Sequence, residues 1–307
     1  MKILFKDKSA VVIVNGWTYS STIMCIVTAR LLGKKVWLRA ESPLNQELRK
    51  RKLILLIKKI LLKHFLFRFF INRCLYIGTE NKKFFNYHGV SEEQMVYTPY
   101  AVDNAYFSAQ HKLLKNDLPA VKAMLGIPEQ KKIILFSGKY VSKKRPLDLV
   151  KAFHLVAKDN YALVMVGEGM LRTEIETYIQ VHQLKQVYLT GFINQSDISK
   201  YYAIADVFVM CSGMGETWGL SVNEAMNFEK PIIVSATCGC SSDLVVHGIN
   251  GFIFNEGDTE QLAGYLAQIL EDNGLRESMG KMSGKIVGDF SIGVSVDNLC
   301  SELYGTD

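Results

Sequence analysis

The sequence predicts an α/β protein with two domains, each organised as βαβ units around a parallel sheet. Short runs rich in β-branched residues alternate with helix-patterned stretches along the whole chain, and this alternation is typical of parallel sheets covered by helices. With 307 residues, of which 49% are hydrophobic, the chain can bury one core per domain. The same figures disfavour a disordered or fibrous protein.

The candidate strands fall into two series. The first series comprises residues 10–14, 36–39, 74–78 and 95–98. The second comprises residues 133–137, 162–166, 187–190, 207–211, 232–234 and 251–254, with helices predicted over 146–158, 171–182, 195–205, 224–227 and 260–272. Residues 101–130 are weakly patterned and punctuated by polar residues, which indicates a connection. We therefore expect one domain over residues 1–128 and a second over 129–307 that ends in a helix.

The positive charge is concentrated in one segment. The chain carries 36 basic and 30 acidic residues, but residues 48–73 contain nine Lys or Arg and no acid, so the remainder is slightly acidic. A helix over this segment would place Lys52, Lys59 and Lys63 on one face and Leu53, Ile57, Ile60 and Leu61 on the other. Either a basic amphipathic helix on an anionic membrane surface or a core helix with a solvated basic face fits this pattern. The interrupting charges disfavour a membrane-spanning helix, and no nucleic-acid-binding module is present.

The cysteines and the N-terminal residues favour a cytoplasmic protein. The six cysteines form no CxxC pair and have no His partners at metal-ligand spacing, so we expect buried thiols in a reducing compartment and no metal site. Cys238 and Cys240 could form a reactive or metal-binding pair, but two ligands do not make a site. Residues 1–7 lack the features of a signal peptide, and the mature chain is expected to begin near Met1.

Two glycine-containing loops follow strands of the second series. Gly138 is followed by Lys139, Lys143, Lys144 and Arg145, and such a cluster of cations where a strand ends suits a diphosphate, although a solvated basic loop is the alternative. Gly167-Glu168-Gly169 follows the next strand. It is a weak signal for a ligand-binding turn, and Arg172 replaces the third glycine of a dinucleotide-binding motif, which disfavours a dehydrogenase.

The segment 213–226 contains two acids, Glu216 and Glu224, with glycines at 213, 215 and 219. The glycines permit a tight turn and close approach of a ligand, and residues 220–226 have the pattern of the first turns of a helix. The two carboxylates could reach two ends of one elongated ligand. By spacing alone they could equally be a first-turn acid stabilised by the helix dipole and a surface residue.

These residues resemble a known family, the retaining glycosyltransferases of family 4, also described as glycosyl transferases group 1, which have two facing Rossmann-like domains in the GT-B fold. Glu216 and Glu224 match the E-x7-E pattern of the family inside a frame similar to G-E-x-W/F-G-L-x-x-x-E-A-M. Further segments similar to the family follow in its order, at 136–139 with Lys144, 166–169, 190–192, 206–209, 230–233 and 247–252.

The resemblance implies roles for individual residues. Lys139 and Lys144 would bind the diphosphate of a nucleotide-sugar donor, and Glu224 the ribose hydroxyls. Glu216, with the backbone of Thr217, Trp218, Gly219 and Leu220, would hold the transferred sugar, so that Glu216, Lys144 and Lys139 carry catalysis. The glycines Gly138, Gly167 and Gly191 would line the donor site. The family usually has Arg at the position of Lys139, and the absence of a D-x-D motif implies a metal-independent enzyme with no cofactor besides the nucleotide-sugar substrate.

The resemblance is poorer before residue 130. The segment 10–17 corresponds to one that family members reach only after several further elements, so we expect a shortened N-terminal, acceptor-side domain. Many members have a His near the transferred sugar, after the strand that corresponds to 36–39. This chain has Arg39 and Glu41 there, and these two are the candidate acceptor-side residues.

The resulting functional expectation is a retaining glycosyltransferase that uses a UDP- or GDP-sugar. Its acceptor would be a glycan or a lipid-linked molecule in cell-surface polysaccharide or glycolipid synthesis. It would lie in the cytoplasm, peripherally on the inner face of an anionic membrane. A non-catalytic nucleotide-sugar-binding fragment and a nucleotide-sugar epimerase of the same fold are the alternatives.

Overall fold

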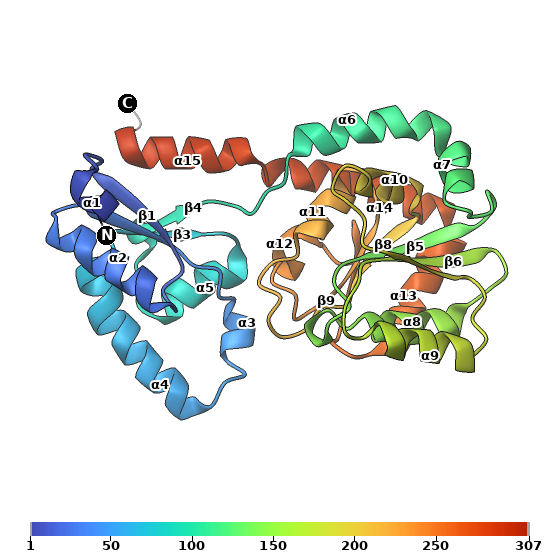
Figure 1. Cartoon of the computed structure of the whole chain (residues 1–307), viewed down its shortest axis with the longest axis horizontal. Coiled ribbons are helices and arrows are strands. Elements are labelled where there is room, and N and C mark those ends of the chain that lie inside the picture. Colours follow the sequence, from blue (N-terminus) through green and yellow to red (C-terminus); the bar gives the residue numbers. More distant parts are fainter. Residues whose placement is uncertain (1, 306–307) are drawn as a thin grey trace. The chain divides into compact units, whose positions relative to one another are not determined.

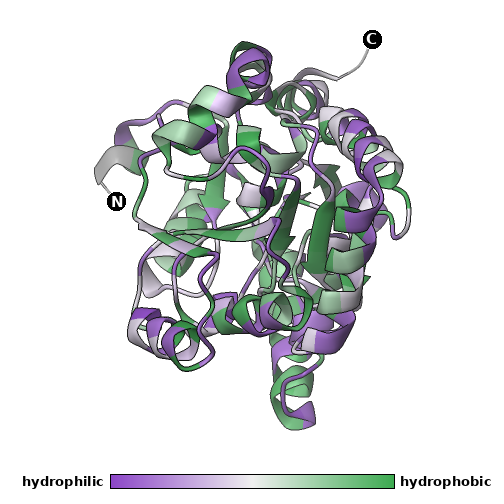
Figure 2. Cartoon of the chain, turned by 90° about the vertical axis from the view of Figure 1, so that its right-hand side faces the viewer, coloured by the Kyte–Doolittle hydropathy of each residue, from purple (hydrophilic) through white to green (hydrophobic). Residues whose placement is uncertain are grey.

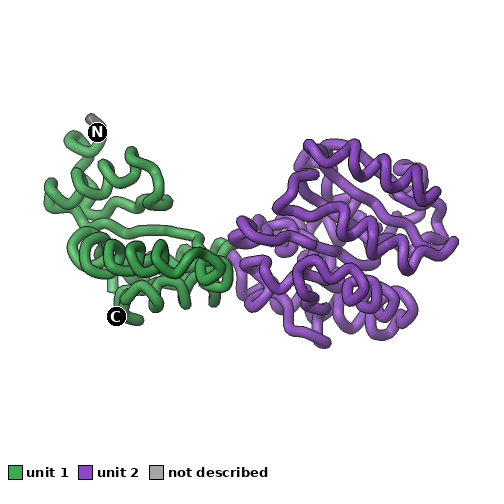
Figure 3. The backbone as a smooth tube through the Cα atoms, turned by 90° about the horizontal axis from the view of Figure 1, so that it is seen from below, with its two compact units in different colours: residues 1–100, 292–307 green, residues 101–291 purple. Residues whose placement is uncertain are grey.

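The chain forms two compact α/β units in the computed structural model, which describes residues 2–305 (Figure 1). The first unit contains the chain up to Tyr100 together with the segment from Ile292 onward, and the second spans Ala101–Ser291 (Figure 3). Every strand pairing in both sheets is parallel among the described residues. The predicted α/β class with two parallel sheets is therefore confirmed.

Within residues 2–305, the first unit holds a four-stranded sheet of order β1-β2-β3-β4. The strands are β1 (Val11–Asn15), β2 (Lys35–Arg39), β3 (Arg73–Tyr76) and β4 (Met95–Tyr97). The helical elements are α1 (Lys2–Lys6), α2 (Ser20–Leu31), α3 (Leu44–Glu47), α4 (Lys52–Leu61), the π-helix η1 (Leu62–Phe70), α5 (Thr79–Tyr87), the 3-10 helix η2 (Glu92–Gln94) and α15 (Ile292–Tyr304). Ile26, Leu38, Phe84 and Phe85 are fully buried and form the centre of its core.

The second unit, all of whose residues are described, is built around a six-stranded sheet of order β10-β9-β8-β5-β6-β7. The strands are β5 (Lys132–Ser137), β6 (Tyr161–Val166), β7 (Val187–Gly191), β8 (Val207–Met210), β9 (Ile232–Ser235) and β10 (Gly251–Phe254). All residues of β6, β8 and β9 are buried, as expected for a sheet covered on both faces. Figure 2 shows strands in the colour of hydrophobic residues between helices that carry hydrophilic residues.

The helices of the second unit connect these strands. They are α6 (Asn104–Leu114), η3 (Lys115–Asp117), α7 (Leu118–Met124), η4 (Ser142–Lys144), α8 (Pro146–Val156), α9 (Arg172–Val181), α10 (Ile198–Ile204), α11 (Leu220–Met226), α12 (Ser241–Leu244), α13 (Thr259–Glu271), α14 (Asn273–Ile286) and η5 (Val287–Asp289). The chain runs from β5 outward to β7 and then returns to β8 on the other side of β5. This reversal creates a switch point, where doubly wound sheets bind ligands at the carboxyl ends of their strands.

The predicted domain division at residue 128 is corrected by the structure. Residues 101–128 belong to the second unit, because Phe107 of α6 is buried against Tyr202 and Phe228. The C-terminal helix α15 belongs instead to the first unit, where the Ser295 hydroxyl donates to the carbonyl of Pro99 and the Asn298 amide to that of Tyr97. A single deeply buried aromatic in α6 leaves too weak a periodicity to detect in the sequence.

A helix over the basic segment is confirmed as α4 and η1, but its faces are placed differently from the core-helix interpretation. Leu55, Leu62, Leu66 and Phe67 are buried, whereas the apolar residues on the opposite side of α4 are exposed. Lys58 points inward, with its ammonium 2.6 Å from a carboxylate oxygen of Glu47. The exposed face of α4 is thus apolar and not basic. No helix among residues 2–305 is long and apolar enough to cross a membrane.

His88, the C-cap residue of α5, is completely buried near the Lys58–Glu47 ion pair. Burial, together with the positive charges of Lys58, Lys59 and Lys50 and against the opposing charge of Glu47, lowers the pKa of His88 from 6.5 to about 4. The folded protein therefore keeps a neutral imidazole between these two values, while the unfolded chain takes up a proton.

We expect the first unit to lose stability as the pH falls from about 6.5 towards 4. At pH 5 the contribution of His88 to this loss is about 2 kcal/mol. A His88→Phe variant, which keeps an aromatic ring against Phe84, should lose correspondingly less between pH 7 and pH 5. Urea unfolding of both proteins at the two pH values measures the difference, and equal losses would contradict the assignment.

Candidate functional site

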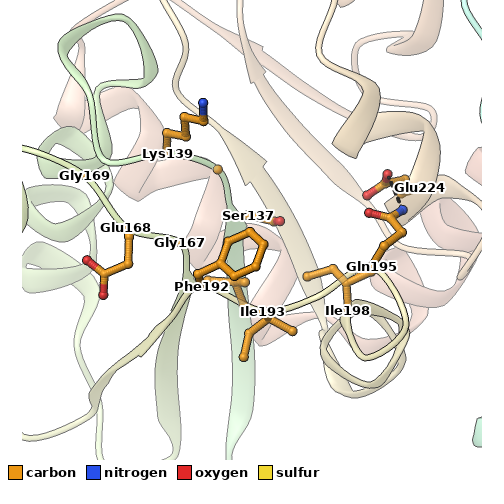
Figure 4. A pocket seen from close by; sticks show the side chains of 12 residues that line it. Ser137, Lys139, Gly167, Glu168, Gly169, Phe192, Ile193, Gln195, Ile198 and Glu224 are labelled. Atoms are coloured by element: carbon orange, nitrogen blue, oxygen red, sulfur yellow. Dashed lines mark hydrogen bonds between the residues drawn. The ribbon is translucent and has the colours of Figure 1, made fainter.

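A cavity of about 390 Å³ opens at the carboxyl ends of β5, β6 and β7, where the topology of the sheet predicts a ligand site. Figure 4 shows Phe192, Ile193 and Ile198 between Gly167 on one side and Glu224 with Gln195 on the other. Its lining residues are Ser137, Gly138, Lys139, Val166, Gly167, Glu168, Gly169, Phe192, Ile193, Gln195, Ile198 and Glu224. Four predicted donor-site residues, Gly138, Lys139, Gly167 and Glu224, are thus brought together.

Close contacts between backbone groups form one wall of this cavity. The amide of Gly138 donates to the carbonyl of Val166 at 3.0 Å, and that of Gly167 donates to the carbonyl of Gly191 at 2.9 Å. A Cβ atom on Gly167 would overlap the carbonyl oxygen of Gly138. Gly167 therefore lets the loops after β5 and β6 touch, and the two hydrogen bonds satisfy backbone polar groups without side chains.

Glu224 projects from α11 and is held by two side chains. The Tyr202 hydroxyl donates to one carboxylate oxygen at 2.6 Å, and the Gln195 amide donates to the other at 3.2 Å. Burial raises the pKa of Glu224, and these hydrogen bonds partly oppose the rise. The interpretation of Glu224 as an ordinary surface acid is therefore wrong, because the half-buried carboxylate lines the cavity in a fixed orientation.

Glu216 forms an ion pair with Lys144. Only 8% of Glu216 is exposed, and Lys144 comes from η4, directly after β5. The two loops are tied together because the Gly213 amide donates to the carbonyl of Lys143 at 2.8 Å. The side chain of Lys144 passes 3.7 Å from where a Cβ of Gly138 would lie, so the ion pair is next to the cavity although it does not line it.

The segment from Thr217 to Leu220 is positioned mainly through its backbone. Trp218 is buried, and its indole donates to the Asn223 side chain at 2.9 Å, so its ring packs in the protein. The amide of Gly239 donates to the carbonyl of Glu216 at 3.1 Å, and a Cβ on Gly239 would overlap the carbonyl oxygen of Thr217. Sequence reasoning missed Gly239, for which the only signal was a glycine between two small apolar residues.

Cys238 and Cys240 flank this glycine and are fully buried, with their sulfur atoms 3.6 Å apart. Burial raises the pKa of the Cys240 thiol well above its ordinary value, which makes it unreactive. Among residues 2–305, no group of three or more His, Cys, Asp or Glu could hold a metal ion. Cys74 and Cys211 are buried as predicted, whereas Cys25 is half-buried and Cys300 is exposed.

Arg39 and Glu41, the candidate acceptor-side residues, lie together in the first unit. The guanidinium of Arg39 stacks over the ring of Tyr100 at 4.8 Å, and the Tyr100 hydroxyl donates to the carboxylate of Glu41. Burial lowers the pKa of Arg39, and the charge of Glu41 opposes that shift. Tyr100, which the sequence did not single out, is what joins the two predicted residues.

The chain has two α/β units, each built on a parallel sheet, and a ligand-sized cavity lies at the switch point of the second sheet. These features define the GT-B class of folds. Comparison with solved structures shows the same fold. Anabaena HepE, solved in complex with UDP, superposes with a TM-score of 0.82 over 99% of this chain and 81% of its own, at 15% sequence identity.

The chain belongs to the family of glycosyl transferases group 1, whose model matches residues 119–285 and thus more than half of the sequence. N-acetyl-alpha-D-glucosaminyl L-malate synthase of Bacillus anthracis is 28% identical over 59% of this chain and 47% of its own length. Alpha-monoglucosyldiacylglycerol synthase of Acholeplasma laidlawii is 29% identical over 53% of this chain and 40% of its own. The chain therefore matches less than half the length of either relative.

Replacement of Gly239 by Ala tests the backbone contact that holds Glu216. The added methyl group must displace the 216–218 backbone, so we expect a loss of about 2 kcal/mol or more in unfolding free energy. Gly264→Ala is the matched control, because Gly264 lies on the exposed side of α13 with open space around it. This control should gain about 0.5–1 kcal/mol. Denaturant unfolding measures the unfolding free energies of both variants. Similar values for Gly239→Ala and Gly264→Ala would contradict the proposed role of the Gly239 contact.

Proposed function

We propose that this chain is a retaining glycosyltransferase that takes a sugar from a UDP- or GDP-sugar. The observation that carries the proposal is the Glu216–Lys144 ion pair beside a cavity that ends at the anchored carboxylate of Glu224. A cation and two carboxylates of different environment are what the diphosphate, sugar and ribose of one extended donor require. The UDP complex of HepE and the names of the related synthases support this choice.

The donor is proposed to lie along the cavity. Phe192, Ile193 and Ile198 offer apolar surface to the base, and Glu224 accepts hydrogen bonds from the ribose hydroxyls. Lys139, exposed at the rim, and Lys144 bind the diphosphate as point charges. Glu216, with the backbone of residues 217–220, holds hydroxyls of the sugar.

The proposed transfer needs no enzymic nucleophile. The acceptor oxygen attacks the anomeric carbon from the face that the diphosphate leaves, so a carbon–oxygen bond forms as the bond to the phosphate oxygen breaks. The acceptor proton passes to the departing phosphate. Lys144 and Lys139 stabilise the negative charge that develops on the leaving group. No metal ion or other cofactor takes part in this scheme.

The acceptor is proposed to be a glycan or a lipid-linked molecule used in cell-surface polysaccharide or glycolipid synthesis, in the cytoplasm at the inner face of the membrane. The first unit offers Arg39 and Glu41, joined through Tyr100, for hydroxyl and anionic groups of such a molecule. The acyl-glycerol product named for the Acholeplasma relative favours a lipid-linked acceptor.

Substitutions that replace a charged side chain by a neutral one of similar size test the donor site. Lys144→Met should lower turnover of the accepted UDP- or GDP-sugar about 100-fold or more, because the leaving group loses its cation. Glu216→Gln should lower it similarly. Glu277→Gln is the matched control, since Glu277 is an exposed residue of α14, and it should leave turnover unchanged. Release and transfer of the labelled sugar are measured after a thermal-shift panel of nucleoside diphosphates has identified the base.

Glu224→Gln should weaken binding of the nucleoside diphosphate itself by about 10-fold or more, because an ionic hydrogen-bond acceptor is lost. Isothermal titration calorimetry measures the dissociation constant without the need for an acceptor. Nucleotide binding without any turnover would instead support a non-catalytic binding protein. A change of sugar configuration in the absence of acceptor, detected by NMR, would identify an epimerase.

A further inference from the structure

The outer side of α4 and η1 presents a continuous row of exposed apolar side chains. Leu53, Ile57, Leu61, Phe65 and Phe69 recur every four residues, which places them on one face of the helix, and they are 68%, 50%, 53%, 60% and 56% exposed. Three further residues that are about half exposed widen this face. We call the whole set the outer ridge; it comprises Leu53, Ile54, Leu56, Ile57, Ile60, Leu61, Phe65 and Phe69.

Contacts within the first unit fix this orientation. Lys58 forms an ion pair with the buried Glu47 and lies 4.9 Å from the centres of the Trp17 and Phe84 rings. Lys59 lies 4.2 Å from the centre of the Tyr87 ring. Lys58 and Lys59, which a soluble amphipathic helix would turn to water, thus face the protein, and the outer ridge faces away from it. A rotation that buried the ridge would break the Glu47 pair.

The size of the ridge sets it apart from ordinary surface residues. Single exposed hydrophobic side chains are common, but soluble proteins rarely expose contiguous apolar patches unless something binds there. Here eight large apolar side chains stand along consecutive turns with no acid in the whole of residues 48–73. The ridge therefore needs a partner that accepts apolar side chains.

The charges beside the ridge identify the partner. Arg49 and Arg51 are exposed before α4, Lys52 is exposed at its first residue, and Lys63, His64 and Arg68 are exposed along η1. Cations that flank an apolar row ending in aromatic rings match the boundary between acyl chains and anionic headgroups. Their long side chains can reach lipid phosphates while the ridge enters the acyl region.

We propose that the outer ridge inserts into the surface of an anionic phospholipid bilayer, with α4 and η1 lying along the membrane plane and the flanking cations on lipid phosphates. The binding energy then comes mainly from buried apolar area, and the cations give a preference for anionic lipid. Lys58 and Lys50 take no part, because both are already paired with Glu47. This surface is separate from the donor cavity, and the proposal stands without the proposed transferase activity.

Sedimentation of the whole chain with phosphatidylcholine vesicles, with and without phosphatidylglycerol, tests the proposal. A Leu53→Ser, Ile57→Ser, Leu61→Ser variant should bind anionic vesicles at least 10-fold more weakly than the parent. The matched control is Leu31→Ser, Leu155→Ser, Val181→Ser, which also replaces three aliphatic side chains by serine, at exposed residues of α2, α8 and α9, and should bind like the parent. Circular dichroism checks that both variants are folded.

A single Ile57→Trp substitution reports insertion directly. Its added fluorescence should shift to the blue on anionic vesicles and be quenched by lipids brominated on their acyl chains. A chain that bound the vesicles only through its basic side chains would give neither the blue shift nor the quenching. Unchanged vesicle binding by the triple-serine ridge variant would overturn the proposal. So would a parent chain that does not bind vesicles but forms dimers that the triple-serine variant does not form.

Discussion

Backbone-to-backbone contact between loops at the carboxyl edge of the second sheet is the constraint on which the candidate site depends. Gly167 lacks the Cβ atom that would overlap the carbonyl oxygen of Gly138 and keep the loops after β5 and β6 apart, and Gly239 allows the same close approach to the loop that carries Glu216. Because these backbone groups satisfy one another, the cavity wall needs no polar side chains.

The two carboxylates illustrate how one loop and one short helix can provide different chemistry. Glu224 receives hydrogen bonds from Tyr202 and Gln195, and burial raises its pKa. Glu216 is as buried as many core residues, yet its charge is balanced by Lys144. A neutral hydrogen-bonded environment suits the recognition of hydroxyl groups, whereas an ion pair places a cation where negative charge can be stabilised. Both carboxylates lie in the segment 213–226, so the difference between them comes from the side chains that the fold places next to each one.

Local patterns predicted the strands well because buried parallel strands are marked by short β-branched runs. The E-x7-E spacing also led to both carboxylates. What could not be predicted depends on residues distant in the sequence. Gly239 matters only because the fold brings it against Thr217, and Gln195 matters because α10 starts beside α11. Likewise, the docking of α15 on the first unit depends on carbonyl groups of Tyr97 and Pro99, which no pattern within residues 292–304 reveals.

The basic segment, residues 48–73, also shows that a local pattern cannot predict contacts with residues outside it. Periodicity correctly divides it into a basic and an apolar face, but which face meets the protein is decided outside the helix, by Glu47 in α3 and by the rings of Trp17 and Tyr87. Glu47 lies only six residues after Glu41, so one short stretch joins the acceptor-side pair to the anchor of the outer ridge. If the ridge holds the first unit at a bilayer, the unit that carries Arg39 and Glu41 is held there with it. The proposed lipid-linked acceptor would then reach the first unit by diffusion in the membrane plane, so the proposed docking surface and the proposed acceptor fit together.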